Sequence, residues 1–135
     1  MTASAASIQP ELWVDGPEAI AFYREAFGAH VLHLVEGPGE ADVVAQLAIG
    51  DAAFWVSSAA AEMGRFSPRA IGGSTARMLL VVADPEAVVE RACAAGAALG
   101  SAVGDEHGWR LGRIVDPFGH EWEVGRPLGA WPPAP

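Results

Sequence analysis

Hydrophobic and polar residues alternate in the first patterned segment of the chain, Glu11-Leu12-Trp13-Val14. Such alternation predicts a short β-strand with Leu12 and Val14 on one face. Across residues 17–27 the large apolar side chains instead recur three and four positions apart, which predicts an amphipathic helix that must cover a sheet. Three short apolar runs follow, and we predict strands at residues 31–36, 43–49 and 53–57.

The same order of elements recurs in the second half of the chain. Pro17-Glu18-Ala19 recurs as Pro85-Glu86-Ala87, and Gly28-Ala29 recurs as Gly96-Ala97, each 68 positions later. Proline in the first helical turn and glycine after the last one match the preferences of helix starts and helix ends. We therefore predict a β-α-β-β-β module that is used twice. The second copy has a first strand ending near Val81, a helix at residues 85–95 and strands at 98–103, 110–115 and 121–125.

A length of 135 residues and a hydrophobic content of 51% fit one domain with a sizeable core. We expect a single domain over residues 1–135, with a first module at about 8–58, a linker at about 59–75, a second module at about 76–126 and a Pro-rich tail at 127–135. The linker is rich in Gly and Ala, and an exposed connection is favoured over a lid that covers a substrate.

Charge and cysteine content exclude several classes of protein. The formal net charge is −9 and every cation is an arginine, so the surface repels the phosphates that a nucleic-acid-binding protein has to neutralise. This charge either serves solubility or attracts cationic ligands. The single cysteine, Cys93, cannot form an internal disulfide, and residues 1–9 lack the pattern of a secretion signal, so we expect a cytoplasmic protein. No uninterrupted apolar run is long enough to span a membrane.

The duplicated module, together with the motif Asp-Pro-Phe-Gly-His-Glu-Trp-Glu at residues 116–123, resembles the vicinal oxygen chelate superfamily. This superfamily includes glyoxalase I, extradiol dioxygenases, fosfomycin-resistance enzymes and bleomycin-resistance proteins. Phe22-Tyr23 followed by Phe27-Gly28-Ala29 is similar to the first-helix motif of the superfamily. Gly108-Trp109-Arg110 resembles its glyoxalase-like, bleomycin-resistance-like branch. The resemblance implies an α+β fold in which two βαβββ modules form a curved mixed or antiparallel sheet around a cavity. It also implies a homodimer.

Within such a fold, strand alternation assigns residues to the cavity face. Leu12 and Val14 belong under the first helix, and Trp122 and Val124 belong under the second. The polar and aromatic residues between them then face the cavity. The predicted ligand-binding residues are Gln9, Glu11, Trp13, Trp55, Arg77, Glu121 and Glu123.

The resemblance also places four metal-ligand positions, at Gln9, Trp55, Arg77 and Glu123. A guanidinium has no available lone pair and an indole N–H only donates, so two of the four positions cannot bind a metal. Two remaining ligands are fewer than the three that a catalytic zinc site usually has. We therefore expect no metal and no other cofactor. We expect Arg77 to pair with Glu123 or Glu11 in place of a metal, the alternative being that Arg77 extends into solvent.

These residues favour a metal-independent protein that binds a small molecule and sequesters a cationic or aromatic compound. One alternative is a metal-free lyase or isomerase that uses a cavity carboxylate as its base, and a metal-dependent glyoxalase- or dioxygenase-like enzyme ranks last. No catalytic residue stands out. None of the four histidines falls on a metal-ligand position, although His120 adjoins the cavity strand and is a candidate for ligand contact as well as for turn structure.

Overall fold

A computed structural model describes residues 5–36 and 42–135 of the protein. Residues 1–4, on which part of the expectation about a secretion signal rests, lie outside the described residues. The chain forms two four-stranded mixed sheets with a helix packed on each, as the duplicated module predicts. None of the described helices has the length and apolar character needed to cross a membrane.

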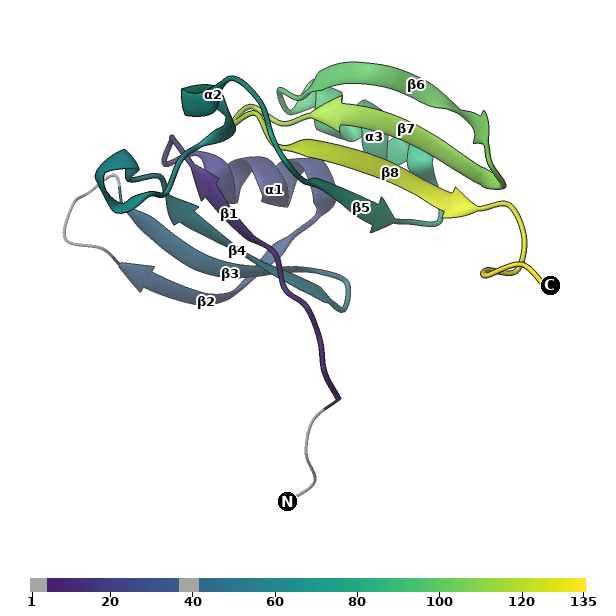
Figure 1. Ribbon diagram of the computed structural model, residues 1–135, viewed down its shortest axis with the longest axis horizontal. Helices are drawn as coiled ribbons and strands as arrows, with labels where there is room; N and C mark the ends of the chain where they lie inside the picture. The colour runs from purple at the N-terminus through teal and green to yellow at the C-terminus, as the bar shows by residue number, and fades with distance from the viewer. Residues whose placement is uncertain (1–4, 37–41) are drawn as a thin grey trace.

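Each sheet has the same strand order. The first sheet has the order β1 (Glu11–Val14), β4 (Ala52–Ser58), β3 (Val43–Ile49) and β2 (His30–Glu36). The second sheet has the order β5 (Arg77–Val81), β8 (Glu121–Pro127), β7 (Trp109–Val115) and β6 (Ala98–Glu106). In Figure 1, β1 and β5 form the inner edges of the two sheets, while β2 and β6 form the outer edges.

The strand register carries the repeat seen in the sequence. Glu11 lies opposite Trp55 in the parallel pair β1–β4, and Leu79 lies opposite Glu123 in the parallel pair β5–β8. These two pairings are related by the same 68-residue offset as the helix motifs. The predicted duplication and fold class are therefore confirmed.

Both helices lie behind the sheets in Figure 1 and leave the opposite faces open. Helix α1 (Ala19–Phe27) buries Phe22, Tyr23 and Phe27, and α3 (Pro85–Ala94) buries Val89 and Ala92. Tyr23 and Phe27 pack against Trp122 of the second module, with ring centroids 5.7 and 4.8 Å apart. One hydrophobic core therefore joins the two modules.

The first helix begins two residues later than predicted, at Ala19 instead of residue 17. The repeat explains the difference. Asp84 caps α3 by accepting a hydrogen bond from the Ala87 N–H (3.2 Å), but the residue 68 positions earlier is Gly16, which has no side chain to cap with. Helix α1 accordingly has no side-chain cap, and its first expected turn is irregular.

Several strand boundaries also differ from the sequence prediction: β2 and β4 begin one residue earlier, and β8 continues to Pro127. The strands β6 and β7 extend further towards their shared turn at His107-Gly108, because their hydrogen-bonded ladder continues to the pair Glu106–Trp109. The linker is mostly exposed, as expected, but it contains a short 3₁₀ helix, η1 (Ala61–Met63), and a short helix, α2 (Pro68–Ile71). Buried Ser67 caps α2 and donates a hydrogen bond to Asp15, which fixes the linker against the end of β1.

Candidate functional site

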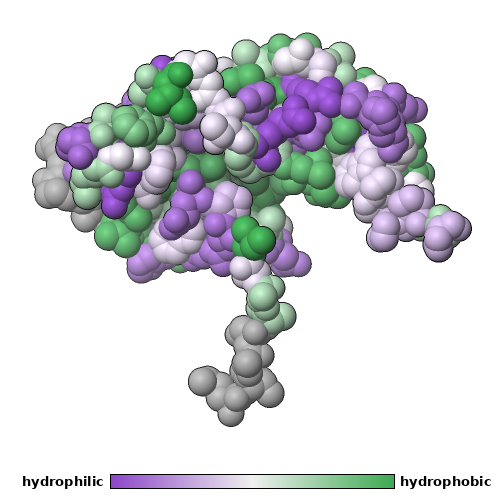
Figure 2. All heavy atoms as spheres, in the orientation of Figure 1, coloured by the Kyte–Doolittle hydropathy of each residue, from purple (hydrophilic) through white to green (hydrophobic). Residues whose placement is uncertain are grey.

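A cavity of about 580 Å³ lies where the two modules meet. Its walls come from the segment before β1, the turn between β3 and β4, and β5, with Trp122 of β8 at the wall shared with the core. Ile8, Ile49 and Leu79 make much of it apolar, while Gln9 and Arg77 supply polar groups. Figure 2 shows hydrophobic surface in the middle of this face, between hydrophilic areas. The volume is in the range of small-molecule pockets.

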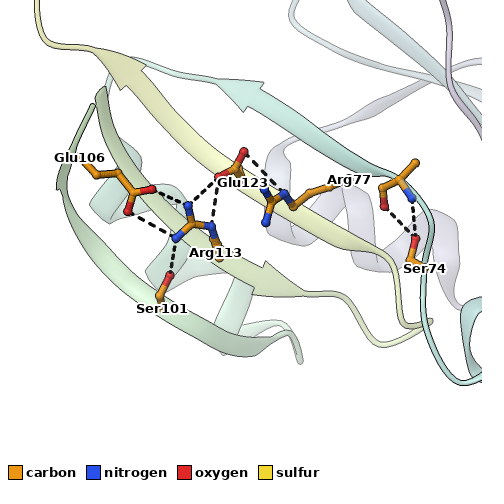
Figure 3. Close-up of polar contacts among 7 residues, drawn as sticks. Ser74, Arg77, Ser101, Glu106, Arg113 and Glu123 are labelled. Carbon is orange, nitrogen blue, oxygen red and sulfur yellow. Dashed lines mark hydrogen bonds and ion pairs between the residues drawn. The ribbon is translucent and has the colours of Figure 1, made fainter. Parts of the chain in front are cut away.

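A row of charged side chains crosses the open face of the second sheet, one from each strand (Figure 3). Arg113 of β7 donates to Glu106 of β6 (Nη2 to Oε1, 2.5 Å) and to Glu123 of β8 (Nε to Oε2, 3.1 Å). The other carboxylate oxygen of Glu123 lies 3.6 Å from Nε of Arg77, at the start of β5. Hydrogen bonding from Arg113 lowers the pKa of Glu106. Glu123 is thus held between two guanidinium groups.

The first sheet has an uncharged counterpart of this row. Gln9 accepts hydrogen bonds at Oε1 from Nε2 of Gln46 (2.9 Å) and from Nε1 of Trp55 (3.0 Å). Gln46 and Trp55 lie opposite each other on β3 and β4, just as Arg113 and Glu123 lie opposite each other on β7 and β8. Within each module, the side chains at these corresponding positions therefore satisfy one another's hydrogen-bonding groups.

These residues do not fit a metal ion. Within each module the predicted metal-ligand positions pair with each other, Trp55 with Gln9 and Arg77 with Glu123. The side-chain oxygen Oε1 of Gln9 already accepts two hydrogen bonds, and the carboxylate of Glu123 already faces the guanidinium groups of Arg77 and Arg113. Among the described residues, no three His, Cys, Asp or Glu side chains are grouped so that they could hold one ion.

The structure distributes the predicted ligand-binding residues over three places. Gln9 and Arg77 line the large cavity. Glu11 and Trp13 line a smaller pocket of about 240 Å³. Trp55, Glu121 and Glu123 line neither of these two hollows and lie half-buried on β4 and β8. The predicted pairing of Arg77 with a carboxylate is confirmed, with Glu123 as its partner and not Glu11.

Sequence reasoning missed two members of these rows, Gln46 and Arg113. Arg113 lies opposite Glu123, and Gln46 lies opposite Trp55, but the offset between Gln46 and Arg113 is 67 residues instead of 68. The connections differ in length: two residues separate β3 from β4, whereas five separate β7 from β8. A comparison of the two modules at a constant offset of 68 residues therefore does not relate Gln46 to Arg113.

The Asp-Pro-Phe-Gly-His turn has a structural role. Asp116 is buried and accepts hydrogen bonds from the Tyr23 hydroxyl, from Nε1 of Trp122 (3.0 Å) and from the backbone N–H groups of Phe118 (2.9 Å) and His120 (3.0 Å). Because Tyr23 belongs to the first module, the turn also ties the modules together. The imidazole Nε2 of His120 lies 2.8 Å from the main-chain oxygen of Trp13.

Comparison with known proteins identifies relatives of this chain. The family model described as Glyoxalase/Bleomycin resistance protein/Dioxygenase superfamily matches residues 13–124. The Mycobacterium bovis protein named uncharacterized protein Mb0911c is 35% identical over 127 residues, which are 90% of this chain and 84% of that protein. Rv0887c of Mycobacterium tuberculosis has the same identity, over 75% of its own length.

Solved structures share the fold over nearly their whole length. The product of Arabidopsis thaliana AT5G48480 is 26% identical with a TM-score of 0.64, covering 91% of this chain and 98% of that chain. TioX from Micromonospora sp. ML1 is 25% identical with a TM-score of 0.66, covering 96% and 100%. The fosfomycin resistance protein FosX from Listeria monocytogenes, in complex with Mn(II) and sulfate ion, has a TM-score of 0.69 at 14% identity, covering 96% of each chain.

Proposed function

The chain belongs to the glyoxalase/bleomycin resistance protein/dioxygenase superfamily, and we propose that it acts as a metal-independent protein that binds a small cationic or aromatic compound. One observation carries the proposal. At the positions where metal-binding members of the superfamily place their ligands, this chain has an arginine and a tryptophan whose N–H groups face Glu123 and Gln9.

The cavity between the modules supports a small-molecule ligand. Apolar side chains make up much of its walls, and Arg77 and Gln9 supply the directional polar groups that orient a ligand in such a pocket. The net charge of −9 favours approach of a cationic compound over an anionic one.

Binding without catalysis is favoured over a metal-free lyase or isomerase. A general base has to reach its substrate with a free carboxylate oxygen. Glu123 instead has one oxygen against Arg113 and the other against Arg77, and Glu106 is bound to Arg113. We propose further that the protein is a cytoplasmic homodimer.

Elemental analysis combined with dye binding tests this function. We expect no stoichiometric transition metal in the purified protein. Proflavine, a planar cationic dye, is expected to bind and to quench tryptophan fluorescence, since Trp122 lies in the cavity wall.

A matched pair of variants locates the binding. Leu79→Arg places a cation in the wall of the cavity, whereas Leu99→Arg changes a strand leucine that is also about half exposed but does not line it. We expect Leu79→Arg to weaken proflavine binding by about tenfold or more through lost apolar contact and charge repulsion, and Leu99→Arg to leave it unchanged. A bound stoichiometric metal, or equal binding by the two variants, contradicts the proposal.

A further inference from the structure

The smaller pocket, of about 240 Å³, differs in chemistry from the large cavity. Its walls come from β1, from the linker and from the turn before β8, and it shares only Ala76 and Met78 with the larger cavity. The linker supplies Phe66 and Ile71, which are otherwise exposed. The pocket is therefore bounded by segments that are far apart in the sequence.

His120 presents a hydrogen-bond acceptor to this pocket. Its side chain is only 8% exposed, and its Nε2 lies 2.8 Å from the main-chain oxygen of Trp13. A carbonyl oxygen can only accept a hydrogen bond, so in the neutral ring Nε2 carries the proton and Nδ1 keeps its lone pair. Nδ1 has no hydrogen-bond partner among the described residues. Every fully buried side-chain nitrogen or oxygen of these residues does have a partner, so Nδ1 is not fully buried. Because His120 lines this pocket, we infer that Nδ1 is exposed to the pocket.

The other lining groups complete a site for a positive charge. Glu11 lines the pocket with a carboxylate that makes no ion pair among the residues described. Trp13 and Phe66 add two partly exposed aromatic rings, whose faces attract cations. The described residues that line it include no arginine, in contrast to the large cavity with its Arg77.

We propose that this pocket binds a compact organic ammonium group, a primary amine attached to a small apolar body. The ammonium N–H groups donate to the Glu11 carboxylate and to Nδ1 of His120, while the apolar body packs against Trp13 and Phe66. The inference goes beyond the proposed function and does not depend on a ligand in the larger cavity.

Three probes of similar shape and different charge test the proposal on the full chain. Benzylamine, benzyl alcohol and benzoate are titrated separately, and the indole N–H signal of Trp13 is followed by NMR. We expect benzylamine to bind about tenfold or more tightly than benzyl alcohol, because only the ammonium gains a charge-assisted hydrogen bond, and benzoate not to bind.

Three variants separate the contributions. Glu11→Gln removes the charge, and His120→Gln moves the acceptor away from the Nδ1 position, because its amide nitrogen takes the place of Nε2 as donor to the Trp13 oxygen. Each is expected to weaken benzylamine binding about fivefold or more. Glu90→Gln makes the same charge change as Glu11→Gln at an exposed residue of α3 outside the pocket and is expected to leave binding unchanged.

Equal affinity for benzylamine and benzyl alcohol overturns the proposal, as does benzylamine binding that neither Glu11→Gln nor His120→Gln weakens. The two proposals fail separately. Leu79→Arg, which blocks the larger cavity, is expected to leave benzylamine binding unchanged, and His120→Gln is expected to leave proflavine binding unchanged.

Discussion

At the scale of single residues, the most consequential side chain is the buried carboxylate of Asp116. A buried charge is tolerated only when hydrogen bonds compensate for its lost hydration. Here four donors from two modules surround it, among them the hydroxyl of Tyr23. Burial raises the pKa of Tyr23 well above its ordinary value of 10.0, and the neighbouring Asp116 carboxylate raises it further. Tyr23 therefore stays protonated in the folded protein where a free tyrosine ionises.

This shift predicts a loss of stability in alkaline solution. Above about pH 10 the unfolded chain releases the Tyr23 proton and the folded chain does not, so the free energy of unfolding falls as pH rises, by at most about 1.4 kcal/mol per pH unit. Tyr23→Phe should abolish this slope and, at pH 7, lower the free energy of unfolding by about 1–3 kcal/mol through the lost hydrogen bond. Urea unfolding between pH 7 and pH 11 measures both effects.

Few other side chains titrate in this alkaline range, because the chain has one tyrosine, one cysteine and no lysine. Cys93→Ser serves as the control for the thiol. An alkaline slope that persists in Tyr23→Phe would show that another group causes it.

At the scale of elements, β8 is the central strand on which the second module depends. It pairs with β5 on one side and β7 on the other, carries Glu123 on the open face, and buries Trp122 and Val124 on the helix face. Gly125 follows in the same strand, where a Cβ atom would overlap the carbonyl oxygen of Arg110 and the side chain of Leu111. Close approach of β7 to β8 at this point requires glycine.

Gly125→Ala is therefore expected to lower the free energy of unfolding by about 1–3 kcal/mol, because the ladder between β7 and β8 has to spread. Gly104→Ala in β6 is the matched control, since nothing lies within 4 Å of a Cβ there, and it should change stability by less than about 1 kcal/mol. Chemical denaturation of both variants measures the difference. Similar values for the two would mean that β8 can shift without loss.

At the scale of the whole molecule, the outer edge strand β2 leaves apolar side chains uncovered. Val31, Leu32, Leu34 and Val35 are each between 38% and 51% exposed. An apolar edge strand is prone to pair with another chain unless it is covered. A second copy of this chain would cover it in a symmetric assembly.

We therefore expect a homodimer that Leu34→Lys weakens, because a charge on β2 has to be desolvated in the interface. Leu128→Lys, at a similarly exposed leucine beyond β8, is the control and should leave the dimer intact. Light scattering at micromolar concentration distinguishes the states. A particle of only 14.0 kDa would reject the dimer, and a dimer unaffected by Leu34→Lys would place the interface elsewhere.

The sequence by itself determined the elements and their faces. The period of two placed Leu12 and Val14 in the core, and the 68-residue repeat related Trp55 to Glu123, which occupy equivalent positions in the two sheets. The alternation is a local feature, because neighbouring residues dictate the backbone geometry of a strand. The second module repeats the local features of the first. The pairing of Arg77 with a carboxylate was predictable from the family resemblance, which places Arg77 and Glu123 at positions that converge on one ion in metal-binding relatives.

Only the tertiary structure decided which side chains share a pocket. Arg113 joined Glu123 because a longer turn before β8 shifts the register of the repeat by one residue. His120 reached Trp13, 107 residues away, because the two modules pack through one core. Contacts of this kind depend on how separately formed elements dock, and no periodicity along the chain encodes that docking.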